Sequence, residues 1–572
     1  MGNWSSIFDI EGSLTENGSG ALAYCNKGKR FACDSESNMV YLGSTGSGKS
    51  RRGTVPLTLS LFENMESGII VDPKGELLRI TKAFIPKGYY VKIFNFRELY
   101  NKKYTAWNPL SAPYELYRYG DLKSRELCHL MISEIARNKY PLPPDSKDPF
   151  WIQEARKVFI GAVYLLFLVA EPWEINLPSV YQMIAKGEEK LGASALINRL
   201  ASFFPNDYNV SMHLESYINT APETKGGIRS VMLDGLSDLV GSEAIRSFIS
   251  NDTLDILSLK GDKPFLIYII LPDETDVYDE LAGILVSQLS THFVRLAEDE
   301  YGGKLPVRLN IVLEELGNIG GAISNLPKLL SAARSRNIRI AYVLQTLSQL
   351  KDVYGEAKAS TILDNTDTRI IYRTNHLKTL NEISELCGVK KVVRDGEPSP
   401  SEVPLIMPDA LAAMDVGQAL VMLRGGIKFV TWLPDFIHLF SPGEMSGYQT
   451  RGEFSRPLEL SSETDWQEPH IFDIKAFVQN RLKENAARAA QNQTARTEAA
   501  QTEAAQDQTA SKGTKYIPTF EEWIAMQRKE KQSMQSGQSE ARKAKDTDTD
   551  ESVAELTRRI DKKIEELEKR ED

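Results

Sequence analysis

The sequence predicts an α/β protein with a mainly parallel sheet, an inserted all-helical domain and a largely disordered C-terminal tail. Three observations predict this class. Apolar runs rich in β-branched residues alternate with helical patterns, this strand signal stops between Phe96 and about Pro264, and the composition changes after about Pro442. The 572 residues, of which 42% are hydrophobic and 26% charged, are enough for several domains of ordinary soluble composition.

Seven apolar runs are predicted to form the parallel part of the sheet. Most are unbroken rather than alternating, which is typical of strands covered by helices on both faces. They are Asn38–Gly43, Gly68–Asp72, Tyr89–Phe96, Pro264–Leu271, Leu309–Glu314, Ile338–Gln345 and Thr368–Arg373. The later stretch ALVMLRGGIKFVTWL predicts an antiparallel hairpin that turns at Gly425–Gly426 and forms an edge of the sheet.

The chain is therefore predicted to have four segments. Residues 1–111 and 251–442 form two parts of the α/β domain, residues 112–250 form the helical domain, and residues 443–572 form the tail. Within the helical domain, Val158–Ala170 is too short to span a bilayer and predicts a buried core helix. Within the tail, Ala486–Gly513 has low complexity and predicts a mobile linker.

Two apolar patterns follow that linker. The first, Tyr516–Gln527, places Phe520, Trp523, Ile524 and Met526 on a short helical pattern. The second forms a stripe of five apolar residues between Val553 and Leu567. The sequence leaves open whether this last stripe is a marginal surface helix or a docking segment.

Charge and cysteine content narrow the class of protein further. The formal net charge of −10 argues against a protein that coats nucleic acid with its whole surface, although a local basic channel remains compatible with it. The four cysteines form no CxxC pair, which argues against a zinc site or a disulfide framework and favours a reducing compartment.

The stretch GSTGSGKS fits the pattern G-x-x-x-x-G-K-[ST], directly after a predicted strand and before a predicted helix. The glycines let backbone N–H groups turn inward around phosphates. The lysine supplies a positive charge between the β- and γ-phosphates, and the last hydroxyl is a ligand for Mg²⁺. We therefore predict that this stretch, called the phosphate loop below, binds a nucleotide through Gly43, Ser44, Thr45, Gly46, Ser47, Gly48, Lys49 and Ser50.

The strand Leu309–Glu314 delivers two carboxylates, Glu314 and Glu315. In many nucleotide-driven motors such a strand delivers an aspartate and then a glutamate to the nucleotide's metal. We predict Glu314 as a metal ligand, because its extra methylene can be absorbed by moving or replacing a water. Asp72 ends another strand, and we expect it near the nucleotide because open α/β sheets bind ligands at the carboxyl ends of their strands.

Several further segments occur in order between about residues 30 and 440: VDPKGEL (Val71–Leu77), WNPL (Trp107–Leu110), VLEELGNIG (Val312–Gly320), Ala333–Gly355 and Ile362–Gly388. Together with the phosphate loop, these segments resemble the type IV coupling proteins, the hexameric DNA-translocating ATPases of bacterial conjugation and type IV secretion. The resemblance implies a RecA-like P-loop nucleotide-binding domain with an inserted all-helical domain that receives the substrate.

The resemblance also implies catalytic roles. Glu315 stands where the family has the carboxylate that activates the attacking water, and Gln345 stands at a position that reports on the γ-phosphate. Arg334 or Arg336 would act as an arginine finger on a neighbouring subunit's nucleotide, and the sequence does not choose between them. The implied cofactors are ATP and Mg²⁺.

The implied partners are single-stranded DNA, a relaxase or relaxosome, the ATPases of the secretion channel and further copies of this chain in a hexamer. Family members usually begin with a transmembrane anchor, and this sequence reaches the phosphate loop without one. We therefore expect a cytoplasmic chain that is recruited to the inner face of the cell membrane, with a separate membrane subunit as one possible anchor. Two alternatives stay open, a non-hydrolysing platform that recruits the relaxosome and another hexameric DNA translocase.

Overall fold

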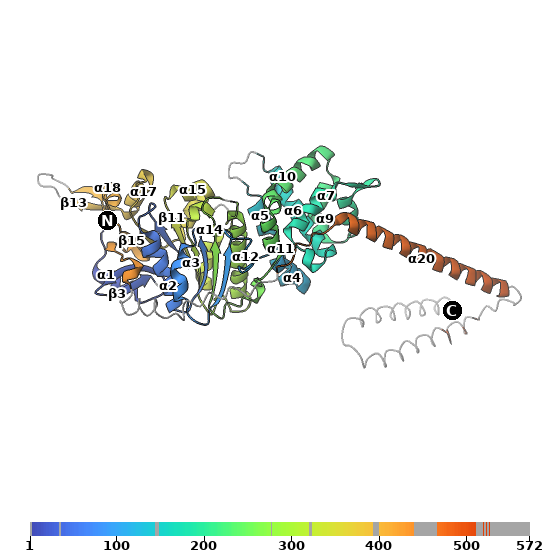
Figure 1. Ribbon diagram of the computed structural model, residues 1–572, viewed down its shortest axis with the longest axis horizontal. Coiled ribbons are helices and arrows are strands. Elements are labelled where there is room, and N and C mark those ends of the chain that lie inside the picture. Colours follow the sequence, from blue (N-terminus) through green and yellow to red (C-terminus); the bar gives the residue numbers. More distant parts are fainter. Residues whose placement is uncertain are drawn as a thin grey trace, which may run out of the picture. The chain divides into compact units, whose positions relative to one another are not determined.

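The computed structural model describes residues 3–33, 36–142, 148–275, 277–319, 323–392, 400–439, 466–510, 519, 522 and 525–526. The chain divides into two compact units, Met1–Arg481 and Leu482–Asp572. The first unit contains the central sheet and the helices between its strands, and it carries the candidate site (Figure 1).

The central sheet has nine strands in the order β16-β15-β12-β4-β11-β10-β5-β9-β6. The seven predicted parallel strands are all present, and the two strands of the hairpin pair antiparallel at one edge, as predicted. The strands are β4 (Met39–Leu42), β5 (Ser67–Asp72), β6 (Tyr90–Asn95), β9 (Phe265–Ile270), β10 (Leu309–Leu313), β11 (Ile338–Leu344), β12 (Thr368–Ile371), β15 (Gln418–Met422) and β16 (Lys428–Trp432).

The parallel strands are apolar because helices cover both faces of the sheet. Every residue of β4, β5, β9, β10 and β11 is buried. The covering helices are α2 (Val55–Glu63), α3 (Glu76–Thr81), α12 (Asp279–Asp299), α13 (Leu316–Ile319), α14 (Leu326–Ala333), α15 (Ser348–Tyr354), α16 (Glu356–Asp364) and α17 (Leu377–Cys387). A π-helical turn, η1 (Ser50–Thr54), joins the phosphate loop to α2.

Some elements were not predicted. The N-terminal residues form α1 (Ile7–Gly12) and a separate antiparallel sheet of β1 (Thr15–Glu16), β2 (Ala21–Asn26) and β3 (Lys29–Cys33). A second small sheet pairs β13 (Val389–Val392) with β14 (Ser401–Pro404), beside α18 (Pro408–Ala412). These strands are short and partly exposed, so they lack the long apolar runs by which the central strands were recognised.

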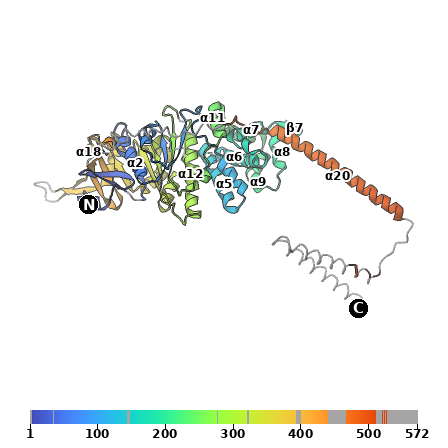
Figure 2. The same cartoon turned by 60° about the horizontal axis from the view of Figure 1, so that its bottom comes forward.

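Between β6 and β9 the chain is helical. In both views these helices gather next to α12, on the side away from α18 (Figures 1 and 2). The long α6 (Phe150–Val169) forms their core, and its residues from Val158 to Phe167 are all buried, as predicted for a core helix. The others are α4 (Ser111–Tyr119), α5 (Leu122–Lys139), α7 (Leu177–Gly187), α8 (Leu196–Ser202), α9 (Tyr208–Asn219), α10 (Pro222–Gly241) and α11 (Glu243–Ser250), with a small hairpin of β7 (Lys190–Leu191) and β8 (Ser194–Ala195).

The tail was predicted to begin at residue 443, but the first compact unit continues to Arg481. Trp466, Phe472, Ile474 and Val478 are buried and belong to the first compact unit. This segment is tied to the helices by hydrogen bonds, for example from Asn176 Nδ2 to the carbonyl oxygen of His470 at 2.8 Å. Its few apolar side chains are spaced too widely to form a periodic pattern, so composition alone assigned them to the tail.

The predicted linker also differs from the structure, in which α20 (Ile474–Ala510) continues through most of it. Alanine, glutamate and glutamine are strong helix formers, and low complexity does not remove that preference. Of the first apolar pattern beyond the linker, Phe520, Trp523 and Ile524 lie outside the described residues, as does the whole stripe between Val553 and Leu567. Among the described helices, none is both long and apolar enough to cross a lipid bilayer.

Candidate active site

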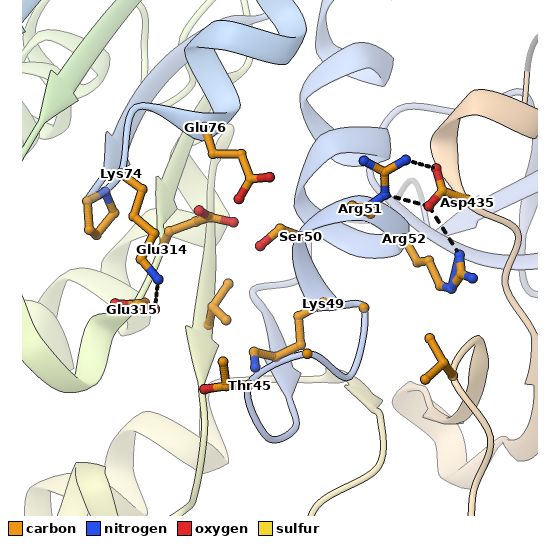
Figure 3. A pocket seen from close by; sticks show the side chains of 15 residues that line it. Thr45, Lys49, Ser50, Arg51, Arg52, Lys74, Glu76, Glu314, Glu315 and Asp435 are labelled. Carbon is orange, nitrogen blue, oxygen red and sulfur yellow. Dashed lines mark hydrogen bonds and ion pairs between the residues drawn. The ribbon is translucent and has the colours of Figure 1, made fainter. Parts of the chain in front are cut away.

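A cavity of about 320 Å³ opens where the parallel strands of the sheet end. Three parts of the chain meet there: the phosphate loop after β4, the turn after β5 and the acidic residues after β10. Figure 3 shows Lys74, Glu76, Glu314 and Glu315 on one side of the loop, and Arg51, Arg52 and Asp435 on the other. The complete lining is Thr45, Gly46, Gly48, Lys49, Ser50, Arg51, Arg52, Pro73, Lys74, Glu76, Glu314, Glu315, Val343, Val416 and Asp435.

The phosphate loop follows β4 and curls through two glycines. Gly46 and Gly48 have φ of 75° and 96°, a region that residues with a side chain rarely adopt. Of the predicted phosphate-binding residues, Thr45, Gly46, Gly48, Lys49 and Ser50 line the cavity, whereas Gly43, Ser44 and Ser47 do not.

The three loop residues outside the cavity lie against neighbouring parts of the chain. The amide of Ser44 donates to the carbonyl oxygen of Arg373 at 2.9 Å. A Cβ on Gly43 would lie 2.7 Å from the hydroxyl of Ser47 and 2.9 Å from Tyr372, so only glycine fits there. We infer that these residues set the shape of the loop.

The Lys49 ammonium lies at the centre of the cavity. It donates to the carbonyl oxygens of Gly43 and Ser44, the second at 2.9 Å. Burial lowers the pKa of Lys49 to about 8, although Glu315 and Glu314 act in the opposite direction. The side chain therefore still carries a positive charge near neutral pH, as a phosphate-binding lysine requires.

The Glu314 carboxyl group is buried, with 6% of the residue exposed. Thr54 Oγ1 donates a hydrogen bond to Glu314 Oε1 at 2.5 Å. Burial raises the pKa of Glu314 to about 7, because it outweighs the hydrogen bonds from Thr54 and Ser50, and the nearby charge of Asp72 adds to the increase. Glu314 is therefore close to its titration point at neutral pH.

Ser50 and Glu314 are the predicted metal ligands, and both line the cavity. In the part of the chain that the structure describes, no cluster of three or more His, Cys, Asp or Glu side chains could hold a metal. A site with two protein ligands fits Mg²⁺, which keeps several waters and is completed by substrate phosphates.

Glu315 differs from Glu314 in backbone and in exposure. Its φ is 53°, in the left-handed region, which costs a residue with a side chain on the order of 1–3 kcal/mol. Its side chain is 26% exposed, and Oε1 lies 3.8 Å from Lys74 Nζ. The strained turn thus ends the buried strand and brings the carboxylate to the solvent-accessible side of the cavity.

Asp72 was predicted to bind the nucleotide, but it does not line the cavity. Its two carboxylate oxygens accept the backbone amides of Glu76 at 3.0 Å and Leu78 at 2.9 Å. Burial raises the pKa of Asp72 to about 6, although these hydrogen bonds act in the opposite direction. Asp72 therefore holds the start of α3, and it acts on the cavity through Lys74 and Glu76, which do line it.

Gln345 follows the end of β11 but is not among the residues that line the cavity. The side-chain oxygen of Gln349 accepts the backbone amides of Gln345 at 2.9 Å and of Thr346 at 3.3 Å. A Cβ on Gly317 would come within 2.5 Å of the same Gln349 side chain. Gln349 therefore links the end of β11 to the segment that follows Glu315.

Arg334 and Arg336 lie in the turn that precedes β11, at the end of the strand away from the cavity. Arg334 pairs with Asp367 at 3.4 Å, and Arg336 pairs with Glu298. The seven residues of β11 span roughly 20 Å, so neither arginine reaches the cavity of its own chain. A finger role would require a second subunit.

Sequence reasoning missed Arg51, Arg52 and Asp435. Arg51 donates to Asp435 through Nε at 2.6 Å and through Nη2 at 2.9 Å, and Arg52 Nη1 lies 3.6 Å from the same carboxylate. The two arginines directly follow the phosphate loop, which was a usable signal. Asp435 gave no signal, because it is far along the chain and its neighbours fit no motif.

Comparison with known proteins identifies the family of this chain. Residues 10–425 match the family described as "Type IV secretory system Conjugative DNA transfer". The chain belongs to this family. The match spans the seven parallel strands, the helical insert, the phosphate loop and the two glutamates, and it ends before β16 and Asp435.

Two curated proteins are similar to this chain over most of its length. The chain is 24% identical over 396 residues to the conjugal transfer protein TraG of Escherichia coli, covering 63% of this chain and 58% of TraG. It is 24% identical over 360 residues to VirD4 of Rhizobium radiobacter, covering 61% of this chain and 48% of VirD4. The chain therefore matches about half of the length of these relatives.

Solved structures of the coupling protein TrwB share the fold. One, in complex with the ATP analogue ADPNP, has a TM-score of 0.57 at 16% identity and covers 76% of this chain and 93% of its own. Another, in complex with ADP and Mg²⁺, has a TM-score of 0.56 at 17% identity and covers 75% and 92%. The RecA-like fold predicted for the central domain is thus confirmed.

Proposed function

We propose that this protein is the coupling ATPase of a bacterial conjugative type IV secretion system, which recruits relaxase-bound single-stranded DNA and drives it to the transfer channel. The observation that carries the proposal is the cavity in which Lys49, Ser50, Glu314 and Glu315 meet, in a chain of the conjugative DNA transfer family. The structures of TrwB with ADPNP and with ADP and Mg²⁺ support the choice of nucleotide and metal.

Lys49 and the backbone amides of the phosphate loop bind the β- and γ-phosphates. Ser50 and Glu314 hold Mg²⁺, which when bound neutralises charge on the phosphate oxygens. Thr54 orients Glu314 through the hydrogen bond to its Oε1. Asp72 keeps the Lys74 segment in place from outside the cavity.

Glu315 orients the attacking water and accepts its proton. Its side chain is partly exposed, Oε1 lies 3.8 Å from Lys74 and Oε2 accepts one hydrogen bond of 3.3 Å from Asn318, so the carboxylate can still accept from a water. Gln345 would report the state of the γ-phosphate through the Gln349 contact to the segment after Glu315. This role stays a prediction, because Gln345 itself does not line the cavity.

The active form is a homo-hexamer in which Arg334 or Arg336 of one subunit reaches the nucleotide of the next. Their position at the edge opposite the cavity supports a role between subunits rather than within one. Both arginines would have to exchange their present partners, Asp367 and Glu298, for a phosphate. Arg334 is the freer of the two, since its side chain is 44% exposed against 19% for Arg336.

The helical domain, residues 112–250, receives the relaxosome, and the hexamer contacts the DNA backbone through lysines and arginines of its central channel. The chain works at the inner face of the membrane together with the ATPases of the secretion channel. The similarity to the conjugal transfer protein TraG supports a role in conjugal transfer, and membership of the conjugative DNA transfer family supports DNA as the cargo.

The test is ATP turnover with and without single-stranded DNA, measured on the wild type and on Lys49→Ala. We expect turnover that DNA stimulates and that Lys49→Ala abolishes, because this variant loses the charge that holds the phosphates. Wild-type turnover that stays at the level of Lys49→Ala under every condition would instead support a non-hydrolysing recruitment platform. DNA binding should weaken steeply with salt, and binding that is independent of salt would contradict phosphate contacts.

A further inference from the structure

We propose that the nucleoside of the bound nucleotide lies at the end of the cavity formed by Arg52, Val416 and Asp435, and that the Asp435 carboxylate selects a nucleoside over an additional phosphate at this end. The inference rests on the proposed nucleotide-binding function. It assigns a role to the part of the cavity that the phosphate loop and the two glutamates do not use.

The direction of the nucleotide follows from the placement of the charged groups. Lys49 and Ser50 fix the β- and γ-phosphates and the metal at the centre of the cavity. Glu314, Glu315 and Lys74 occupy one side of them, where the metal and the attacking water belong (Figure 3). The α-phosphate and nucleoside must therefore leave on the other side, where Arg51, Arg52 and Asp435 lie.

An ion-pair cluster is built at that other side. Arg51 holds Asp435 with two hydrogen bonds of 2.6 Å and 2.9 Å and also lies over the ring of Phe436 at 4.9 Å. Arg52 Nη1 lies 3.6 Å from the same carboxylate. Burial acts to raise the pKa of Asp435, but the hydrogen bond from Arg51 and the charges of both arginines keep it below its ordinary value. Asp435 is therefore ionised at neutral pH.

The charge of Asp435 changes what this end of the cavity can bind. Two guanidinium groups without a carboxylate would form an attractive site for phosphate. With Asp435 ionised between them, a further phosphate meets a negative charge, whereas a ribose hydroxyl or an amino group of a base can donate a hydrogen bond to the carboxylate. The cluster thus favours the uncharged part of the nucleotide.

Arg52 is held beside the loop by two glycines. A Cβ on Gly48 would lie 3.2 Å from Arg52 Cδ, and a Cβ on Gly417 would lie 3.3 Å from Arg52 Nε and 3.0 Å from the ring of Trp432. Among the described residues, Arg52 Nε and Nη1 are buried without a hydrogen-bond acceptor. Arg52 thus lines this end of the cavity with a guanidinium group whose hydrogen-bonding capacity is not used up by the protein.

Val416 gives this end an apolar wall. It lines the cavity although 42% of the residue is exposed, so a larger side chain there would extend into the cavity without disturbing the core. A base packed against Val416 and the guanidinium plane of Arg52 would be held by apolar contact and stacking, which do not require a particular base.

The test compares Mg²⁺-ATP with inorganic tripolyphosphate and Mg²⁺, by isothermal titration calorimetry on the full chain. Val416→Trp should weaken ATP binding by about tenfold or more and change tripolyphosphate binding by less than about twofold, since only ATP carries a nucleoside. Val430→Trp is the matched control: Val430 is 43% exposed on the same hairpin and does not line the cavity, so both ligands should bind as in the wild type.

Asp435→Asn is the second variant to be measured with the same two ligands. It should strengthen tripolyphosphate binding several-fold and reduce the preference for ATP, because it removes the negative charge between the two arginines. An equal loss of both ligands in Val416→Trp, or an unchanged preference in Asp435→Asn, would overturn the nucleoside site. A wild type that binds neither ligand would overturn the proposed nucleotide-binding function itself.

Discussion

Charged residues at the two ends of the parallel strands, called the two edges of the central sheet below, have different surroundings. At the edge where the parallel strands begin, Glu66 and Arg339 form a buried ion pair at 3.0 Å. At the edge where the strands end, Lys49, Glu314 and Glu315 face a cavity. Both edges belong to the same strands, so the difference lies in what surrounds each charge.

At the first edge every charge is matched. Glu66 accepts from Ser19 Oγ at 2.5 Å, from Asn310 Nδ2 at 2.9 Å and from Arg308 Nη1 at 3.0 Å, in addition to Arg339. Arg339 also donates to Asn310 Oδ1 at 2.7 Å and to the backbone of Ser19 at 3.1 Å. Through Ser19, this cluster joins the small N-terminal sheet of β1, β2 and β3 to the central sheet.

At the second edge the charges are matched only in part. Burial raises the pKa of Glu314 to about 7, and Glu315 has a lysine at 3.8 Å and a hydrogen bond of 3.3 Å from Asn318 Nδ2. Buried charged groups whose hydrogen bonds and ion pairs are complete stabilise the fold. Charged groups with incomplete hydrogen bonding are available to bind a ligand. The comparison therefore predicts that substitutions at the two edges affect different properties.

The largest effect is expected from Glu315→Gln. The amide keeps the size of the side chain but cannot accept the proton of water, so ATP turnover should fall by about 10²–10⁴-fold. The melting temperature should not fall, because Glu315 occupies a strained turn and forms no close ion pair. Turnover and melting are measured on the same preparation, and a turnover near the wild-type value would remove Glu315 from the reaction.

The second effect concerns stability at the other edge. Glu66→Gln should lower the free energy of unfolding by about 3–5 kcal/mol, because it removes the buried carboxylate that accepts from Arg339, Arg308, Asn310 and Ser19. Glu63→Gln is the control, since Glu63 pairs with Arg30 at the surface and should change stability by no more than about 1 kcal/mol. Denaturant unfolding measures both, and equal losses would contradict the buried network.

The third effect is on pH dependence. When the pKa of a carboxyl group is higher in the folded chain than in the unfolded chain, the folded state loses stability as pH rises from the unfolded pKa to the folded one. For Glu314 this window runs from the ordinary value of 4.5 to about 7. Over the same window, Mg²⁺-dependent ATP binding should strengthen with pH, by about tenfold per pH unit below 7, because the metal needs the carboxylate. Glu314→Gln should flatten both profiles.

In that variant, the remaining pH dependence near pH 6 would belong to Asp72, whose pKa is also raised. A Mg²⁺-ATP affinity in the wild type that does not change between pH 5.5 and 8 would contradict the metal-binding role of Glu314.

The smallest effect is expected from Glu314→Asp. Shortening the side chain weakens the hydrogen bond from Thr54, but a water can fill the gap to the metal. Turnover should therefore stay within about threefold of the wild-type value. A rise from almost no turnover to rapid turnover would instead indicate that the native glutamate favours binding over hydrolysis.

The sequence predicted what local patterns encode. The phosphate loop has a fixed spacing, and the central strands are continuous apolar runs, so both were found directly. The left-handed turn at Glu315 has no such signature, because nothing in the letters EELG requires a positive φ. The direction of the Asp72 side chain was not predicted for a related reason: the end of a strand indicates where the residue lies, whereas the contacts of its carboxylate depend on α3.

Contacts between distant parts of the chain escaped prediction. Asp435 meets Arg51 across 384 positions, and Arg339 meets Glu66 across 273. The segment around Trp466 packs on helices that lie far before it in the sequence. Such pairs depend on how the elements pack, and a single sequence carries no periodic signal for them.

The most direct test measures ATP turnover and melting temperature for two variants side by side, Glu315→Gln and Glu66→Gln. We predict a crossed pattern, in which Glu315→Gln loses turnover but melts like the wild type, while Glu66→Gln melts at a lower temperature but hydrolyses ATP normally where it is folded. If Glu315→Gln keeps its turnover, or if Glu66→Gln loses turnover without losing stability, the division between a chemical edge and a structural edge is wrong.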